Sequence, residues 1–121
     1  MKFEDINFEE YPEGEREHYS SERNPNPKHG SIHLESLTSP IKPELEGVWV
    51  SVVSHKYSYG GDKGLYEIGV YNNKVMACPD LDGWDDTVKG WLREEHIERE
   101  INRMIEAIKN KTFEFRHSYS K

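Results

Sequence analysis

The chain has 121 residues, of which 34% are hydrophobic and 32% are charged, and its formal net charge is −7. This length fits one domain rather than two, and the low apolar content indicates that part of the chain lies outside the core. The negative charge disfavours direct contact with nucleic acid or an anionic membrane, and it favours a partner with a basic surface.

The first 30 residues are predicted to form an acidic, partly extended arm. From Pro12 to Gly30 the sequence has almost no apolar side chain except Tyr19, and Pro25 and Pro27 interrupt strand pairing. The arm is either solvated chain or a segment that becomes ordered on a basic partner. Residues 31–121 are then a single α+β domain. Eight acids fall within residues 1–22, against Lys2 and Arg16: Glu4, Asp5, Glu9, Glu10, Glu13, Glu15, Glu17 and Glu22.

Strand patterns follow from residue 31 to residue 78. SIHLESL alternates in part, and GVWVSVVSHKY is β-branched and apolar on both faces, which predicts a central strand. GLYEIGVY and YNNKVMAC are predicted to form a hairpin turning at Asn72-Asn73. That turn pairs Val70 with Val75 and places both on one face.

One long helix is predicted near the C-terminus. Ile97, Ile101, Met104, Ile105 and Ile108 recur on one face of a 3.6-residue period. Arg93 is its expected N-cap. The sequence does not define residues 79–92, apart from a helical turn expected near Asp85, and TFEFRHSY is predicted to be a last strand. The predicted fold is therefore a small antiparallel sheet of four or five strands packed in two layers against this helix.

The segment HKYSYGGDKG, residues 55–64, is predicted to be the tip between two strands. Its glycines are followed by a strand rather than by the helix N-terminus that a phosphate-binding loop needs, and no G-x-G-x-x-G or Walker pattern is present. Tyr57 and Tyr59 suit an interface because tyrosine offers a large contact area at low entropic cost. A plain connecting loop is the equally open alternative.

An acidic cluster surrounds Gly83. Aligning that glycine with position 6 of a calcium loop puts Cys78 and Lys89 at two ligand positions, so the cluster does not fit such a site. A second interpretation is an acidic patch with tryptophans beside it, which would contact a basic protein pocket. The predicted partner-binding residues are Asp80, Asp82, Trp84, Asp85, Asp86, Tyr57 and Tyr59.

No cofactor, metal site or catalytic residue is predicted. The six histidines follow no metal-ligand spacing, and the single cysteine, Cys78, lies in no nucleophile motif. A lone cysteine forms no internal disulfide, and the acidic N-terminus resembles no secretory signal, so we expect a cytoplasmic protein.

Three functions remain open from the sequence. The first is a binding protein that neutralises or inhibits a partner by occluding a basic functional surface, in the manner of immunity proteins or phage anti-defence proteins. The second is a binder that sequesters a nucleotide-like small molecule, as a monomer or a homodimer, with Lys56, Tyr57, Tyr59, Lys63 and Arg116 as ligand-binding residues. The third is a small enzyme that uses His55, His117 or an aspartate of residues 80–86.

Overall fold

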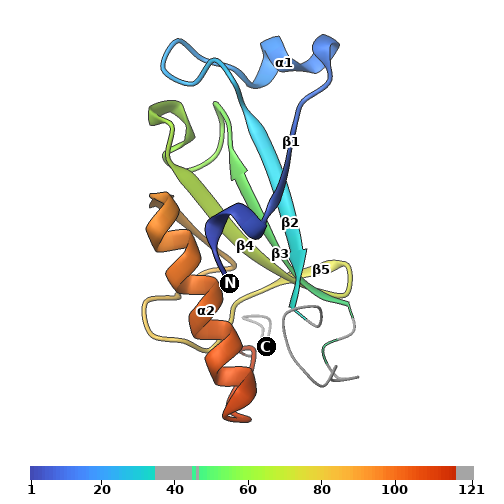
Figure 1. The fold of residues 1–121 in the computed structure, drawn as a ribbon, viewed down its shortest axis with the longest axis vertical. Helices are drawn as coiled ribbons and strands as arrows, with labels where there is room; N and C mark the ends of the chain where they lie inside the picture. Colours follow the sequence, from blue (N-terminus) through green and yellow to red (C-terminus); the bar gives the residue numbers. More distant parts are fainter. Residues whose placement is uncertain (35–44, 46, 117–121) are drawn as a thin grey trace.

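In the part of the chain that the structure describes, six antiparallel strands and a long C-terminal helix form two layers (Figure 1). The computed structural model describes residues 1–34, 45 and 47–116. The predicted α+β sandwich is confirmed. The strands are β1 (Asn7–Glu10), β2 (Lys28–His33), β3 (Val48–Ser54), β4 (Tyr66–Asn72), β5 (Val75–Ala77) and β6 (Val88–Leu92); the helices are α1 (Glu13–Tyr19) and α2 (Glu94–Lys109), with 3-10 turns η1 (Phe3–Asp5) and η4 (Gly61–Lys63).

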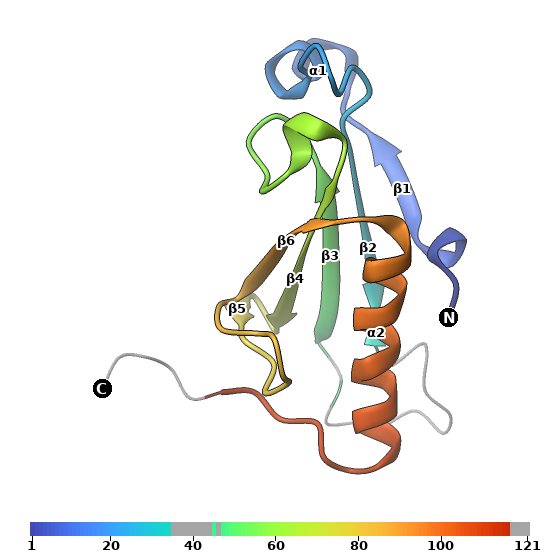
Figure 2. The same cartoon turned by 90° about the vertical axis from the view of Figure 1, so that its left-hand side faces the viewer.

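The sheet has the order β1-β2-β3-β4-β5, and β6 also pairs with β4. β5 pairs with the C-terminal half of β4, whereas β6 pairs with its N-terminal half. β3 has a partner strand on each side, as its two apolar faces predict. α2 covers one face of this sheet, and Figure 2 shows the two layers side by side.

The core lies between α2 and the covered face. Val48, Val50 and Val52 of β3 are buried there, together with Ile68 and Val70 of β4. The predicted helix stripe faces them and is buried along its whole length: Ile97, Ile101, Met104, Ile105 and Ile108. Arg93 is the N-cap, as expected, and Leu92 and Ile97 are both buried where they enclose the first turn.

The β4–β5 hairpin turns one residue later than predicted. Asn72 pairs with Val75 and Val70 pairs with Ala77, so the two-residue loop is Asn73-Lys74. Asn73 has a φ of 61°, and its N–H donates to the carbonyl of Gly47 at 2.8 Å. The positive φ that a tight hairpin loop needs is therefore taken by the second asparagine. Val75 stays on the predicted face but extends beyond the core and is 68% exposed.

The first 30 residues contain more regular structure than an extended arm. β1 pairs with β2 from Asn7↔Ser31 to Glu10↔Lys28, and Ile6 is buried in the core. Residues 13–19, expected to be extended, form α1. β2 begins at Lys28, so the predicted boundary at residue 30 falls inside a strand. The division of the chain into an arm and a domain stays a prediction.

The segments on either side of α2 also differ from the prediction. Residue 85 is irregular and residues 86–87 form a bend, so the expected helical turn is absent there, and residues 88–92 form β6. Of the predicted last strand, residues 112–116 make only one isolated bridge, between Phe115 and Pro79, and His117 and Tyr119 lie outside the described residues. Within residues 1–34, 45 and 47–116, neither helix has the length and apolar character that a membrane crossing requires.

Candidate partner-binding surface

The β3–β4 connection is a closed, hydrogen-bonded turn rather than an open loop. The Ser58 hydroxyl donates to the carbonyl of His55 at 3.0 Å and accepts the His55 N–H at 3.0 Å. Gly61 is buried against both residues, and a Cβ at this position would collide with the His55 carbonyl. Gly60 and Gly64 flank η4 with φ of 84° and 78°, so the glycines allow the chain reversal, as the sequence predicts.

Three aromatic side chains are exposed at this end of the molecule. Tyr57 and Tyr59 are each 58% exposed and Trp91 is 57% exposed. The N–H of Trp91 donates to the carbonyl of Tyr59 at 3.1 Å, so β6 lies directly against the β3–β4 turn. The Tyr59 N–H donates in turn to the Glu67 carboxylate at 2.8 Å. We call Tyr57, Tyr59 and Trp91 the aromatic tip.

Trp91 reaches the tip through a bulge in β6. The β4–β6 register shifts between Tyr66 and Ile68, and Trp91 has a φ of 60°. This left-handed conformation costs a bulky residue free energy, and it turns the indole outward while Leu92 points into the core. Gly90 precedes it because a Cβ there would collide with Tyr59. The bulge therefore places an exposed tryptophan where an ordinary strand would not.

A cluster of stacked rings joins α1 to the turn. Tyr11 stacks on Tyr19 with ring centroids 4.3 Å apart, and Tyr19 contacts the His55 ring at 5.2 Å. The His18 ring lies 5.3 Å from Tyr57, and the Lys56 N–H donates to the Tyr19 carbonyl at 2.8 Å. Burial raises the pKa of Tyr11, and the nearby Tyr19 and Glu15 raise it further. These contacts hold α1 beside the aromatic tip.

His55 is neutral in this arrangement. Its Nδ1 accepts the N–H of Tyr57 at 3.0 Å, so the ring proton is on Nε2. Burial lowers the pKa of His55; the Glu67 carboxylate opposes this shift, and the neighbouring His29 adds to it. Protonation at Nδ1 would remove the acceptor that orients Tyr57. The histidine therefore supports the tip, and nothing in its contacts marks it as a catalytic base.

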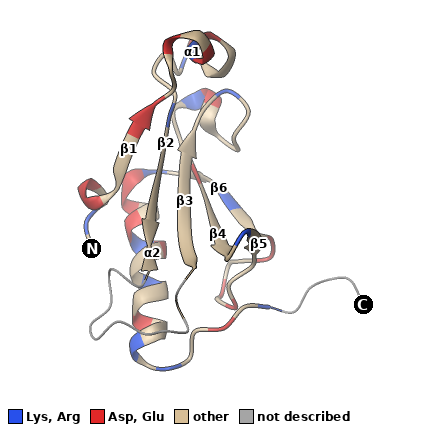
Figure 3. Cartoon of the chain, turned by 90° about the vertical axis from the view of Figure 1, so that its right-hand side faces the viewer, with Lys and Arg blue, Asp and Glu red and all other residues tan. Residues whose placement is uncertain are grey.

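Charged side chains surround the aromatic tip with acids in excess. α1 presents exposed acids immediately beside it, and Figure 3 shows red on α1, β1 and η1. Two lysines lie beside the aromatic tip: Lys56 Nζ is 5.6 Å from the centre of the Tyr57 ring, and Lys63 Nζ is 5.5 Å from that of Trp91. The exposed acids on α1, β1 and η4 are Glu9, Glu10, Glu13, Glu15, Glu17 and Asp62.

The acidic loop of residues 80–86 lies at the other end of β6, away from the aromatic tip (Figure 2). Asp80, Asp82, Asp85 and Asp86 are all exposed, as predicted. Trp84 is not: it is 1% exposed, so its prediction as a contact residue is wrong. The indole is buried beneath the loop, and its Nε1–H donates a hydrogen bond to a buried acceptor in α2.

That acceptor is Glu100, whose side chain is 1% exposed although it carries a carboxylate. Its carboxylate accepts from Trp84 Nε1 at 3.0 Å, from Lys89 Nζ at 3.0 Å and from an Arg103 Nη at 2.7 Å. Burial alone would raise the pKa of Glu100, but the hydrogen bonds from Trp84 and Lys89 and the charges of Lys89 and Arg103 lower it overall. The arrangement is structural, because it fastens the acidic loop to α2.

The structure divides the predicted ligand-binding residues. Lys56, Tyr57, Tyr59 and Lys63 lie together in the turn, whereas Arg116 pairs with Asp80 at 3.3 Å in the region of the acidic loop. Cys78 is a buried thiol, and burial raises its pKa. The described residues contain no group of histidine, cysteine and acidic side chains that could hold a metal ion.

Sequence comparisons with protein-family models and with curated proteins, and a comparison of the fold with solved structures, gave no match.

Proposed function

We propose that this chain is a small acidic binding protein that neutralises a partner protein by occluding a basic functional surface on it. The observation that carries the proposal is the aromatic tip: three aromatic side chains, each more than half exposed, held at one end of the molecule beside the acids of α1. Exposed aromatic residues are enriched at the energetic centre of protein interfaces, and a surrounding charged rim adds specificity.

The rigidity of the tip supports an interface over a plain loop. Tyr59 is held through its backbone by Glu67 and Trp91, and Tyr57 by His55. A backbone that is held in place before binding loses less conformational entropy when the complex forms. The strained φ of Trp91 is consistent with the same role, because strain in a native fold concentrates at functional positions.

The acidic loop has a different part in the proposal. With Trp84 buried, its exposed groups are carboxylates alone, and these act at longer range than aromatic contacts. Complementary charge raises the association rate and rejects wrong partners more than it holds a complex together. We therefore assign the loop to attraction and the aromatic tip to affinity.

The alternative of a nucleotide-like ligand is favoured by one observation, the two lysines that lie over aromatic rings in the turn. Aromatic stacking and cationic groups would suit a phosphorylated ligand. Arg116 cannot belong to the same ligand site, because it pairs with Asp80 in the acidic loop. Its distinguishing mark is saturable binding of a nucleotide that Lys63→Gln weakens.

The experiment is capture of partners from a native lysate at low and high salt, followed by calorimetry with the purified partner. We expect a basic protein whose binding weakens as salt rises, because salt screens exposed charges. Tyr59→Ser and Trp91→Ser should each weaken the complex at least about 30-fold, the loss typical of an interface hot spot. Val75→Ser is the matched control, since it removes an apolar side chain on β5 that is more exposed than Tyr59 or Trp91 and lies away from the tip.

Changing Asp82, Asp85 and Asp86 to Asn tests the role of the acidic loop in attraction separately from the role of the aromatic tip in affinity. This variant should slow association a few-fold and reduce the salt dependence, with little change in the dissociation rate. An acidic partner, or a complex that tolerates both tip substitutions, would contradict the proposal.

A further inference from the structure

The face of the sheet that α2 leaves uncovered carries a shallow trough across the strands. Its floor is a row of short side chains set by the strand register: Asn7 opposite Ser31, Ser31 opposite Ser51, and Ser51 opposite Gly69. Figure 3 views this side of the sheet, with α2 behind it. Small residues in one row lower the surface between the taller rows on either side. We call this feature the cross-strand trough.

The two walls of the trough differ in chemistry. On one side Glu9 of β1 lies directly opposite His29 of β2. On the other, Trp49 of β3 is stacked on Tyr71 of β4, with ring centroids 4.2 Å apart and ring planes within 4°. The stack fixes the orientation of the indole. One wall therefore has a carboxylate beside an imidazole, and the other is a fixed aromatic surface.

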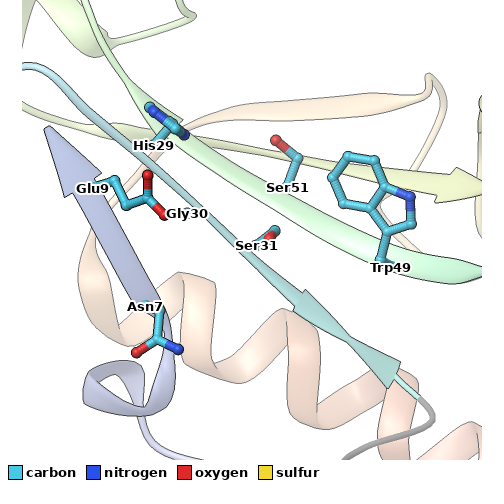
Figure 4. A pocket seen from close by; sticks show the side chains of 7 residues that line it. All are labelled: Asn7, Glu9, His29, Gly30, Ser31, Trp49 and Ser51. Carbon is cyan, nitrogen blue, oxygen red and sulfur yellow. The ribbon is translucent and has the colours of Figure 1, made fainter. Parts of the chain in front are cut away.

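The trough ends at β4. A Cβ on Gly69 would lie 3.0 Å from Met76 Cε and 3.3 Å from Val88 Cγ1, so these two side chains close the row at that end. The open part is a cavity of about 280 Å³ over β1, β2 and β3 (Figure 4). Sites for drug-sized ligands have about 300–1,000 Å³. This volume fits one long side chain better than a whole cofactor.

The polar groups of the trough suit a cation. Glu9 is its one acidic residue, and no lysine or arginine is among the described residues that line it. Asn7, Ser31 and Ser51 add oxygen atoms that accept hydrogen bonds. A guanidinium group is planar, stacks on aromatic rings and donates through five N–H groups, whereas an ammonium group is compact and more strongly hydrated.

We propose that the cross-strand trough binds an arginine side chain of the basic partner, with the guanidinium against Trp49 and paired with Glu9. This inference rests on the proposed function for its partner, but the trough is a different surface from the aromatic tip. The chain's net charge of −7 and the acids of β1 favour the same sign of ligand.

The probe is N-acetyl-arginine amide, titrated into the full chain and followed by two-dimensional amide NMR. The chain has three tryptophans, so the indole N–H signal of Trp49 can be identified by its loss in Trp49→Leu. We expect that signal and the amides of Ser31 and Ser51 to move, while the Trp91 indole stays in place. N-acetyl-citrulline amide, which has the same shape without the charge, should leave all of them unchanged.

Matched variants test the two walls separately. Glu9→Gln and Trp49→Leu should each weaken arginine binding about two- to fivefold, the range for an exposed ion pair or an exposed cation–π contact. Glu106→Gln removes the same charge from an exposed position on α2, on the other side of the sheet, and should change nothing.

The outcomes separate this inference from the proposed function. Equal binding of the citrulline or lysine amide, or shifts confined to the aromatic tip, overturns the arginine site. A captured basic partner whose affinity is insensitive to both Glu9→Gln and Trp49→Leu also overturns it, while the proposed function stands. Arginine binding in the trough without any basic partner supports the site and contradicts the proposed function.

Discussion

Trp91 allows the strain in the aromatic tip to be measured without a partner. Its φ of 60° costs an L-residue about 1–2 kcal/mol, a cost that glycine does not have. Glycine instead loses about 0.5–1 kcal/mol more than alanine through the entropy of the unfolded chain. Trp91→Gly and Trp91→Ala lose the same indole contacts, so these cancel in the comparison. The Gly variant should therefore be more stable than the Ala variant by about 0.5–1 kcal/mol.

Val75 provides the reference for this comparison, because it is exposed in β5 and has no positive φ. Val75→Gly should be less stable than Val75→Ala by about 0.5–1 kcal/mol, the opposite sign. Urea unfolding of the four variants, followed by far-UV circular dichroism, gives both differences from the transition midpoints. If alanine is the more stable residue at both positions, the bulge is not strained and the argument from strain to function fails.

Three further predictions concern the contacts that support the acidic loop and the aromatic tip. Glu100→Gln should destabilise the fold by about 1.5–3 kcal/mol at neutral pH, measured by urea unfolding. Because the pKa of Glu100 is lowered in the folded state, the stability of the unaltered chain should also fall as the pH drops below 4.5, and the variant should lack that loss. The lowered pKa of His55 predicts that stability begins to fall below pH 6.5, where the unfolded chain takes up the proton first. His55→Asn keeps a hydrogen-bond acceptor and should reduce this dependence of stability on pH. An unchanged pH dependence would refute the role given to His55. Gly61→Ala should cost about 1–3 kcal/mol by overpacking, whereas Gly14→Ala in α1, where nothing lies within 4 Å, should stabilise by about 0.5–1 kcal/mol; similar thermal midpoints for the two variants would contradict this account of the turn.

Elements with a strong hydrophobic period were predictable from the sequence. β3 and α2 bury long, regular sets of apolar residues, and both lie where the pattern places them. The β4–β5 turn was predicted one residue early because two adjacent asparagines can each adopt positive φ, and the tertiary contact of Asn73 with Gly47 selects the second.

The N-terminal segment and β6 were harder to predict because their stability comes from distant contacts. α1 has no buried residue and is held by ring contacts to His55 and Tyr57, which local sequence does not reveal. The acids that surround Trp84 in the sequence predict a surface anchor, yet its hydrogen-bond partner, Glu100, is 16 residues away. A helical glutamate on the edge of the isoleucine stripe was the one available signal.

The candidate surface was predictable in part. Tyr57 and Tyr59 are exposed beside a glycine-rich turn, as the sequence indicates. Trp91 joins them only through the β6 bulge, and the cross-strand trough exists only in the register of four strands. Such features depend on pairing between segments far apart in the chain, which residue patterns within one segment do not encode.

The most direct test of the account is the affinity of the captured partner for the unaltered chain and for the Tyr59→Ser and Trp91→Ser variants, with Val75→Ser alongside. The account predicts a basic partner, a loss of about 30-fold or more for each tip variant, and no change for the control. Tip variants that bind as tightly as the unaltered chain would show that the aromatic tip is not the binding surface.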